Sequence, residues 1–280
     1  MQPRRYPTML SIAGSDSIGG AGVQADVKTA TLLGVYAMTA ITAVTAQNSC
    51  GVRQSLSLPD ELIRAQLDAV FDELRPGAVK TGMIPSATSA RTIADTLEAR
   101  RVRNLVVDPV LVSSSGHTLC GALESYIATA TQHLFPLAAL VTPNIPETAA
   151  ILGISPEEVA ARPEASARRF LSQCGCSAVL IKGGHRAGDK AADLLYTGSN
   201  IHIFESPRIL TRNDHGTGCT LSAAIASFLA LGEPIADAVA NAKKFLSRGL
   251  ELGRDFRLSD TDEQAGHGPL YLLPDNPLQL

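Results

Sequence analysis

Short apolar runs alternate along the chain with segments in which apolar residues recur with helical spacing. The apolar runs have the length of buried strands, and the periodic segments between them indicate helices that pack on a sheet. We expect strands at 8–13, 37–46, 78–81, 104–108, 138–142 and 178–182, and a hairpin over 193–204.

Helical periodicity is strongest over 60–74, where six residues lie on or beside an inner face: Leu62, Ile63, Gln66, Leu67, Val70 and Phe71. A further helix begins near Cys219 and runs to 231. The other expected helices cover 23–33, 86–100, 123–134, 165–173 and 234–253.

Strand and helix alternate throughout, with neither a linker-like segment nor an internal repeat. This order predicts an α/β fold with three layers and a mainly parallel sheet, in one domain over residues 1–280. Residues 254–280 contain turn residues and prolines without periodicity, so we expect an irregular tail and assign it no role.

The composition is that of a globular protein with no preference for polyanions. Hydrophobic residues make up 45% of the chain, charged residues 18%, and the formal net charge is -3. The lack of a basic excess and of tryptophan argues against a nucleic-acid partner. No apolar run is long enough for a membrane span or a secretory leader. The five cysteines are odd in number and widely spaced, which favours a reducing cytoplasm.

The segment Asn213–Thr220 (Asn-Asp-His-Gly-Thr-Gly-Cys-Thr) has the residues of an anion site. Gly216 and Gly218 allow backbone N–H groups to point into one hollow, and the following helix start adds free N–H donors. Cys219 would lie in the first helical turn, where a helix N-terminus lowers the pKa of a thiol. Such a site suits phosphoryl transfer to a hydroxyl, although the same residues also fit a glycine-rich turn with a core thiol.

Other polar residues follow the predicted strands, at the sheet edge where α/β proteins bind ligands. Gln47 ends the second strand and could read the edge of a heteroaromatic ring, or it could be a solvated loop residue. Asp108 ends a continuous apolar strand, and Lys182 ends a later one. Asn144 and Glu147 are three residues apart at a helix start, which fits a capping box, a metal ligand, or both.

The loop Gly14–Gly22 follows the first strand and lets the backbone approach a ligand closely. It is not a P-loop, because Gly20 and Ala21 stand where Lys and Ser or Thr would be needed. It is not a Rossmann fingerprint either, because its glycines have other offsets. The loop at 110–120 is long and contains three serines, which is typical of a lid.

Several short motifs cover nearly the whole chain: Ala13–Asp16, Gly19–Asp26, Thr42–Asn48, Lys80–Met83, Asp108–Val110, Thr142–Glu147, Lys182–His185 and Asn213–Ala226. Their joint order and spacing resemble the ribokinase-like superfamily. Within it, they are similar to the hydroxymethylpyrimidine and phosphomethylpyrimidine kinases of thiamine biosynthesis.

The resemblance implies a ribokinase-like fold and a transfer of phosphate that depends on ATP and Mg²⁺. The first acceptor would be 4-amino-5-hydroxymethyl-2-methylpyrimidine, and the second would be its monophosphate, which gives the diphosphate. The resemblance also suggests a homodimer, and it leaves open whether a monovalent cation assists.

The resemblance further implies roles for individual residues. Gln47 would hydrogen-bond the pyrimidine edge, Ala21 and Met83 would flank the ring, and Gly14 and Asp26 would lie at the substrate end. Gly216, Thr217 and Gly218 would form the anion hole, with Cys219 as the base. Asp108 and Glu147 would serve the Mg²⁺–phosphate region, and Asn144, Lys182, Thr211 and Asp108 would serve the nucleotide phosphates.

Three features depart from the family pattern. Asp214 stands where threonine is common, and we expect its carboxylate to face outward, away from phosphates. Ser114 stands where many members have lysine, which could weaken phosphate affinity or the second step. The tail keeps Gly266–Leu270 and then diverges.

Two other functions remain open at this point. Pyridoxal and pyridoxine kinases share the superfamily, and vitamin B6 also presents a hydroxymethyl group on a nitrogen aromatic. A pyrimidine-binding sensor without catalysis is the other, although Cys219, Glu147 and Lys182 argue against it. A sugar kinase is disfavoured because its base would be an aspartate.

Overall fold

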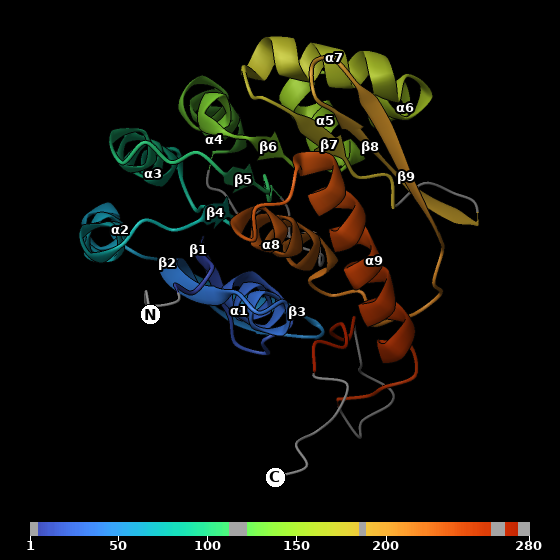
Figure 1. Cartoon of the computed structure of the whole chain (residues 1–280), viewed down its shortest axis with the longest axis horizontal. Helices are drawn as coiled ribbons and strands as arrows, with labels where there is room; N and C mark the ends of the chain where they lie inside the picture. The colour runs from blue at the N-terminus through green and yellow to red at the C-terminus, as the bar shows by residue number, and fades with distance from the viewer. Residues whose placement is uncertain (1–4, 112–121, 185–188, 259–266, 274–280) are drawn as a thin grey trace.

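The structure is a computed structural model of the chain, and it describes residues 5–111, 122–184, 189–258 and 267–273. Within these ranges a nine-stranded sheet has the order β3-β2-β1-β4-β5-β6-β7-β8-β9 (Figure 1). The strands are β1 (Thr8–Asp16), β2 (Tyr36–Asn48), β3 (Gly51–Ser57), β4 (Ala78–Thr81), β5 (Leu105–Val107), β6 (Leu140–Val141), β7 (Val179–Ile181), β8 (Lys190–Tyr196) and β9 (Ile201–Pro207).

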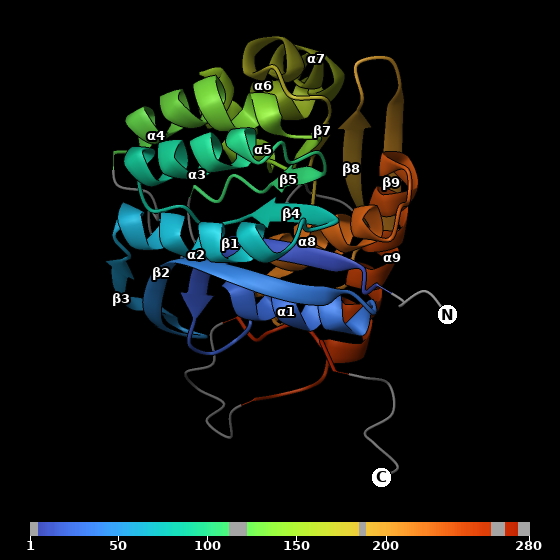
Figure 2. The same cartoon turned by 60° about the vertical axis from the view of Figure 1, so that its left-hand side comes forward.

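Helices cover both faces of this sheet, so the predicted three-layer α/β fold is confirmed (Figure 2). One face carries α1 (Gly22–Leu32), α8 (Thr217–Ala230) and α9 (Ile235–Gly253). The other carries α2 (Asp60–Glu73), α3 (Ala87–Ala99), α4 (Leu123–Thr129), α5 (Ile145–Leu152), α6 (Pro156–Ala161) and α7 (Pro163–Cys174). None of the helices in the described ranges combines the length and apolarity that crossing a membrane requires.

The six strands β1, β2 and β4 to β7 pair in parallel, whereas β3, β8 and β9 pair antiparallel with their neighbours. Both faces of the central strands are covered, which is why strands such as β5 are continuous apolar runs with no exposed side chain. Because parallel strands share one direction, their carboxyl ends meet at a common edge. Asp108, Asn144 and Lys182 follow the ends of β5, β6 and β7, whereas Gly14 and Gln47 lie within the last residues of β1 and β2.

The sequence pattern does not reveal β3 or α6. Residues 53–57 of β3 are exposed at the edge of the sheet, so no apolar alternation marks the strand. The short helix α6 follows its cap, Ser155, whose hydroxyl accepts the N–H of Glu158. Helix α7 begins at Pro163, slightly before the expected start at 165, because proline suits a first helical position.

Part of the C-terminal tail is packed against the molecule, although its sequence is irregular. Leu270 and Leu272 are 5% and 8% exposed and pack with Ala25 of α1. The carbonyl of Gly268 accepts the N–H of His215 at 3.0 Å. This part of the tail therefore has a structural role, which the sequence alone does not assign.

Candidate active site

Two charged residues meet at the carboxyl ends of β5 and β7. The Nζ atom of Lys182 lies 2.7 Å from Oδ1 of Asp108, and both side chains are largely buried. Thr142, after β6, donates to Oδ1 of Asp108 at 3.1 Å, and Ser222 of α8 donates to Oδ2 at 3.2 Å. Sheet and helix thus converge on a single carboxylate.

Both members of this pair are charged. Burial alone would raise the pKa of Asp108, but the ammonium groups of Lys182 and Lys80 hold it below its ordinary value. Burial alone would lower the pKa of Lys182, but Asp108 and Glu147 raise it. Lys182 therefore supplies a fixed positive charge at the strand ends.

Glu147 and Asn144 form a reciprocal capping box at the start of α5. The N–H of Asn144 donates to Oε2 of Glu147, and the N–H of Glu147 donates to Oδ1 of Asn144, both at 2.8 Å. Burial raises the pKa of Glu147 to about 7, with Lys182 opposing the rise and Asp108 adding to it. The predicted cap is confirmed, and the role of Glu147 toward a metal stays a prediction.

The predicted anion segment enters α8 through a turn that favours glycine. Gly216 has a φ of +84°, and a Cβ atom there would overlap the carbonyl oxygen of Gly20. A Cβ atom on Gly218 would lie 3.4 Å from Nζ of Lys182 and 3.6 Å from Oδ2 of Asp108. The start of α8 therefore faces the Lys182–Asp108 pair. No side chain of the described residues caps this helix. The N–H of Thr217 donates to the carbonyl of Asp214 at 3.3 Å, which leaves the N–H groups of Gly218 and Cys219 for an anion.

Cys219 lies in the first turn of α8 and is partly buried. The expectation of a lowered thiol pKa is wrong for this structure, because burial raises the pKa of Cys219 to about 11. Lys80 opposes this rise, while the carboxylates of Asp26 and Asp108 add to it. The helix start alone therefore does not produce a thiolate near neutral pH.

A chain of polar side chains joins the first loop to the anion segment. Nε2 of His215 lies 3.0 Å from Oδ2 of Asp16 and 3.2 Å from Nε2 of Gln47. The N–H groups of Gly20 and Ala21 also donate to Oδ2 of Asp16, at 3.0 and 2.8 Å. Burial opposes ionisation of Asp16, but the bonds from His215 and Ala21 outweigh it, so its pKa is lowered. Gln47 is thus brought to the site and held beside His215.

Two close contacts lie beside these polar side chains: Gly14 lies against Met83, and Ala21 lies against the turn at Gly216. A Cβ atom on Gly14 would lie 2.9 Å from the sulfur of Met83, so glycine permits this close approach. A Cβ atom on Gly216 would lie 3.3 Å from Cα of Ala21, which places Ala21 against the anion turn. The structure brings these predicted residues together, and their contact with a ligand stays a prediction.

Asp26 has no exposed surface and lies in a buried ion pair. Nζ of Lys80 lies 3.0 and 2.8 Å from its two carboxylate oxygens, and Ser11 donates to Oδ2 at 2.5 Å. Burial alone would lower the pKa of Lys80, but Asp26, Cys219 and Asp108 raise it. The place of Asp26 at the substrate end stays a prediction.

Thr211 lies in the segment before the anion turn. It lines a surface cavity of about 580 Å³ together with Arg208, Arg212 and Arg254. Its hydroxyl accepts the N–H of Asn213 at 3.0 Å and lies 3.3 Å from the carbonyl oxygen of Arg254. Asp214 and Asp255 line the same cavity, so its charge is mixed, and a contact of Thr211 with phosphate stays a prediction.

The departures from the family pattern can be placed only in part. Asp214 is exposed, and its Oδ1 lies 2.6 Å from Nδ1 of His267 in the tail. Asp214 also lines the cavity beside Thr211, so its position away from phosphates stays a prediction. Ser114 and the loop at 112–120 lie outside the described residues, as do His185 and Gly266.

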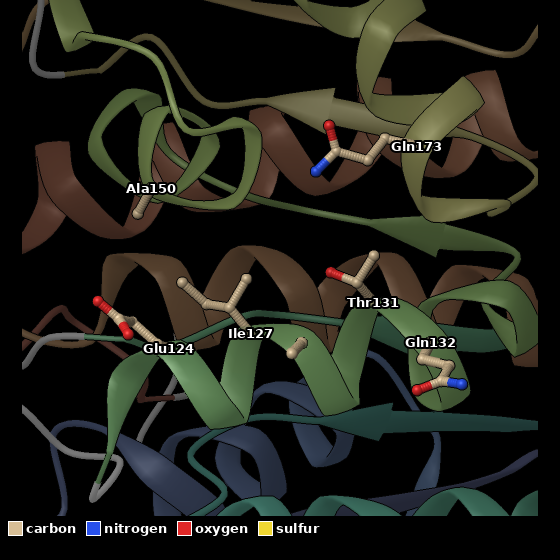
Figure 3. Close-up of a pocket in the computed structure, with 7 residues that line it drawn as sticks. Glu124, Ile127, Thr131, Gln132, Ala150 and Gln173 are labelled. Carbon is tan, nitrogen blue, oxygen red and sulfur yellow. The ribbon is translucent and has the colours of Figure 1, made fainter.

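A second surface cavity, of about 420 Å³, lies away from the strand ends between α4 and α5 (Figure 3). Ile127, Ala128 and Ala150 make much of its wall apolar, and Glu124 is at its rim. None of the residues predicted for the site lines it. It is therefore separate from the cluster described above.

Sequence reasoning misses the roles of Asp16, Lys80, His215 and Ser222. The sequence does give one indication for Lys80, because a charged residue inside the buried strand β4 requires a buried partner. Asp16 and His215 belong to quoted motifs, but their pairing joins residues 199 positions apart. Only the folded chain shows that they meet.

An anion-binding helix start, a buried lysine and acidic groups gather at the sheet edge of a ribokinase-like fold, and together they define a phosphotransferase. The chain belongs to the phosphomethylpyrimidine kinase family, whose sequence profile matches residues 16–270.

Individual relatives agree with this family. The chain is 44% identical over 264 residues to the hydroxymethylpyrimidine/phosphomethylpyrimidine kinase of Rhizobium meliloti, covering 94% of this chain and 95% of that protein. It is 43% identical over 271 residues to the thiamine biosynthesis bifunctional protein ThiED of Geobacter sulfurreducens, covering 95% of this chain. It spans 53% of that longer protein, or about half its length. The ADP complex of Bacillus subtilis pyridoxal kinase matches the fold with a TM-score of 0.84 and 34% identity, covering 94% of this chain and 96% of that one.

Proposed function

We propose that this protein transfers phosphate from ATP to the hydroxymethyl group of 4-amino-5-hydroxymethyl-2-methylpyrimidine, and then to the monophosphate. The product of the second step is the diphosphate used in thiamine biosynthesis. The observation that carries the proposal is the start of α8, which faces the Lys182–Asp108 pair and holds Cys219 in its first turn. The family and the names of the relatives support the same substrate.

The backbone of residues 216–219 stabilises the transferred group. Gly216, Gly218 and Cys219 would offer N–H groups at a helix N-terminus, where charge develops on the phosphoryl oxygens. The N–H of Thr217 donates to the carbonyl of Asp214 in this structure and would have to turn to join them. Losing one donor of this kind costs about 3 kcal/mol of transition-state stabilisation in comparable sites. Lys182 adds its positive charge close to Gly218, because a Cβ atom on Gly218 would lie 3.4 Å from its Nζ atom.

Cys219 accepts the proton of the hydroxymethyl group. The O–H bond breaks toward the thiolate sulfur while the oxygen forms its bond to the γ-phosphorus, and the bond from that phosphorus to ADP breaks. With a pKa of about 11, the thiol is ionised in only a small fraction of the unliganded protein at neutral pH. The transfer of the hydroxymethyl proton to Cys219 therefore becomes faster as the pH rises toward about 11, because the thiolate fraction grows.

Magnesium fits the acidic groups at the strand ends. Mg²⁺ takes one or two carboxylates together with phosphate oxygens and keeps several waters. Glu147 and Asp108 would hold it, and the ion would neutralise charge on the phosphates. Asn144, Lys182 and Thr211 would contact the phosphates directly.

The pyrimidine ring lies between Ala21 and Met83 in this proposal. Gly14 leaves room beside the ring, and Gln47 reads its polar edge with an amide that can donate and accept. Nε2 of Gln47 lies 3.2 Å from Nε2 of His215, so the two side chains are already neighbours before substrate binds. Preorganisation of this kind lowers the entropic cost of binding.

Pyridoxal kinase activity is the alternative, because a pyridoxal kinase matches this fold with a TM-score of 0.84. Side-by-side measurement of kcat/KM for the pyrimidine and for pyridoxal with ATP distinguishes the two. We expect at least a tenfold preference for the pyrimidine, because the proposed hydrogen bonds of Gln47 pair with its polar edge. A preference for pyridoxal would overturn the proposed substrate.

The proposal includes a homodimer in a reducing cytoplasm. Strand β3 is an exposed edge on which Leu56 is 64% exposed, and a second copy would cover it. Cys50, Cys174, Cys176 and Cys219 are free thiols, which suits a reducing compartment. Light scattering in solution tests the dimer, and the mass of one chain, 29.4 kDa, would contradict it.

A further inference from the structure

The segment His267–Leu272, called here the C-terminal strap, lies against the anion turn and beside α9 (Figure 1). Its first contacts are polar. The carbonyl of Gly268 accepts the N–H of His215 at 3.0 Å, and the N–H of Gly268 donates to the carbonyl of Arg212 at 2.9 Å. The strap thereby pairs with the residues that immediately precede the turn at Gly216.

Side chains reinforce this pairing. Nδ1 of His267 lies 2.6 Å from Oδ1 of Asp214. Cβ of Pro269 would lie 3.1 Å from a Cβ atom on Gly20, which places the proline against the first loop. The strap therefore touches both segments that form the anion turn and the wall beside it.

The second half of the strap is anchored by apolar packing. Leu270 and Leu272 are buried with Ala25 of α1, and Cys219 of α8 packs against the same cluster. Phe245 and Leu246 of α9 complete it. Three helices therefore meet around the strap at the point where the proposed base lies.

Further contacts fix the strap against α9. The N–H of Tyr271 donates to the carbonyl of Gly249 at 3.3 Å, and the ring of Tyr271 lies 5.1 Å from that of Phe256. The amide of Asn213, next to the strap, donates to the carbonyls of Gly253 and Phe256 at 2.6 and 2.7 Å. The anion segment is thus tied to α9 both directly and through the strap.

We infer that the C-terminal strap positions the anion turn and Cys219 for phosphoryl transfer, with Leu270 as its principal positioning residue. The inference rests on the proposed function. Catalytic groups must be held within a fraction of an ångström of their productive geometry, and an error of about 1 Å can cost a factor of about 10² in rate. Glycines around the turn make it intrinsically adaptable, so a packed neighbour is needed to hold it.

The first test compares Leu270→Ala with a matched truncation elsewhere. Leu229 lies near the other end of α8, is 8% exposed and belongs to a separate core cluster. We expect Leu270→Ala to lower kcat about tenfold with the KM for ATP changed less than about twofold, because positioning acts in the transition state. Leu229→Ala should keep kcat within about twofold, although it too removes buried apolar atoms.

Rescue separates positioning from simple loss of stability. Leu270→Met conserves volume, and we expect it to restore kcat to within about threefold of wild type. Circular dichroism at the assay temperature confirms that each variant is folded. A Leu270→Ala variant with wild-type kcat, or an equal loss of kcat in Leu229→Ala, would overturn the inference.

A second readout does not depend on kinase activity. In a Cys50→Ser/Cys120→Ser background, a thiol reagent reports on Cys219, because Cys174 and Cys176 are buried. We expect Leu270→Ala to raise the labelling rate of Cys219 about fivefold or more, because the cluster that covers it is opened. An unchanged rate would contradict the strap's role, whereas a wild-type protein inactive toward the pyrimidine would contradict the proposed function instead.

Discussion

Among single residues, Cys219 combines a helix start that favours its thiolate with surroundings that oppose it. Burial and the nearby carboxylates outweigh Lys80 and raise its pKa to about 11. The sequence shows only the helix start, which predicts a lowered pKa for Cys219, whereas the folded structure raises it. Asp26 and Asp108 come from α1 and from the end of β5, and their effect depends on the folded arrangement.

The raised pKa predicts how the rate depends on pH. Between pH 7 and 10, kcat/KM for the pyrimidine should rise continuously, because the thiolate fraction grows as the pH approaches about 11. Cys219→Ala should lower kcat by a factor of about 10² and abolish this rise, while calorimetry shows retained pyrimidine binding. A plateau of kcat/KM from pH 8 onward, or near-normal turnover of Cys219→Ala, would exclude this residue as the base.

The raised pKa of Glu147 predicts how the stability of the protein depends on pH. The folded pKa of about 7 lies above the ordinary 4.5, so the folded protein holds this proton more tightly than the unfolded chain does. The stability it contributes is therefore full below about pH 4.5 and is lost as the pH rises through 7. Glu147→Gln removes the titration but can keep the capping box, because glutamine also serves at that position.

Urea unfolding at several pH values checks this account of Glu147. Relative to Glu147→Gln, the wild-type free energy of unfolding should fall by about 2 kcal/mol between pH 5 and 8. The same variant should require more Mg²⁺ for half-maximal activity, because one carboxylate ligand is lost. A difference in stability that does not change with pH would show that Glu147 titrates normally.

At the scale of elements, the start of α8 distinguishes two glycines that look alike in the sequence. Gly216 has a left-handed φ of +84° and touches the carbonyl of Gly20, whereas Gly218 has helical surroundings with space for a methyl group. The first glycine is required by the backbone. For the second, the proposed reason is the anion that would approach between the helix and Lys182.

Two alanine variants separate these requirements. Gly216→Ala should lower the free energy of unfolding by about 1–3 kcal/mol, because of backbone strain and overlap with Gly20. Gly218→Ala should leave stability unchanged or raise it by about 0.5–1 kcal/mol, yet lower kcat at least tenfold by blocking the phosphoryl group. Thermal unfolding and steady-state kinetics measure both effects. If Gly218→Ala retains full activity, the anion does not lie at this turn.

Most elements that build the sheet edge could be predicted from the sequence. Continuous apolar runs mark buried parallel strands, and Asp108 and Lys182 end two of them, so their meeting follows from topology. Strand β3 could not be found, because an exposed edge strand lacks the alternation that marks a half-buried one. The strap could not be found either, because Leu270 is buried without any periodic pattern around it.

At the scale of the whole molecule, the Lys80–Asp26 pair joins the central sheet to α1 beneath the site. Both side chains are fully buried, and each satisfies the other. Removing one charge leaves the other unpaired in the interior, which typically costs about 3–5 kcal/mol. The pair therefore holds α1 against the sheet, and its two charges also act on the pKa of Cys219.

Single and double substitutions test this link. Lys80→Met and Asp26→Asn should each destabilise the protein by about 3–5 kcal/mol, and the double variant should lose less than their sum. Lys244→Met, which removes an exposed lysine of α9, should change stability by less than about 0.5 kcal/mol. Urea unfolding measures all four variants. Additive losses in the double variant would mean that the two charges do not stabilise each other.

The central claim is that the start of α8 and Cys219 transfer phosphate from ATP to a hydroxymethylpyrimidine. Incubation of the purified chain with ATP, Mg²⁺ and 4-amino-5-hydroxymethyl-2-methylpyrimidine, followed by mass detection, tests it most directly. The monophosphate should form first and the diphosphate later, and the Cys219→Ala variant should form much less of both. Absence of both products from the wild-type protein, with pyridoxal phosphorylated under the same conditions, would contradict it.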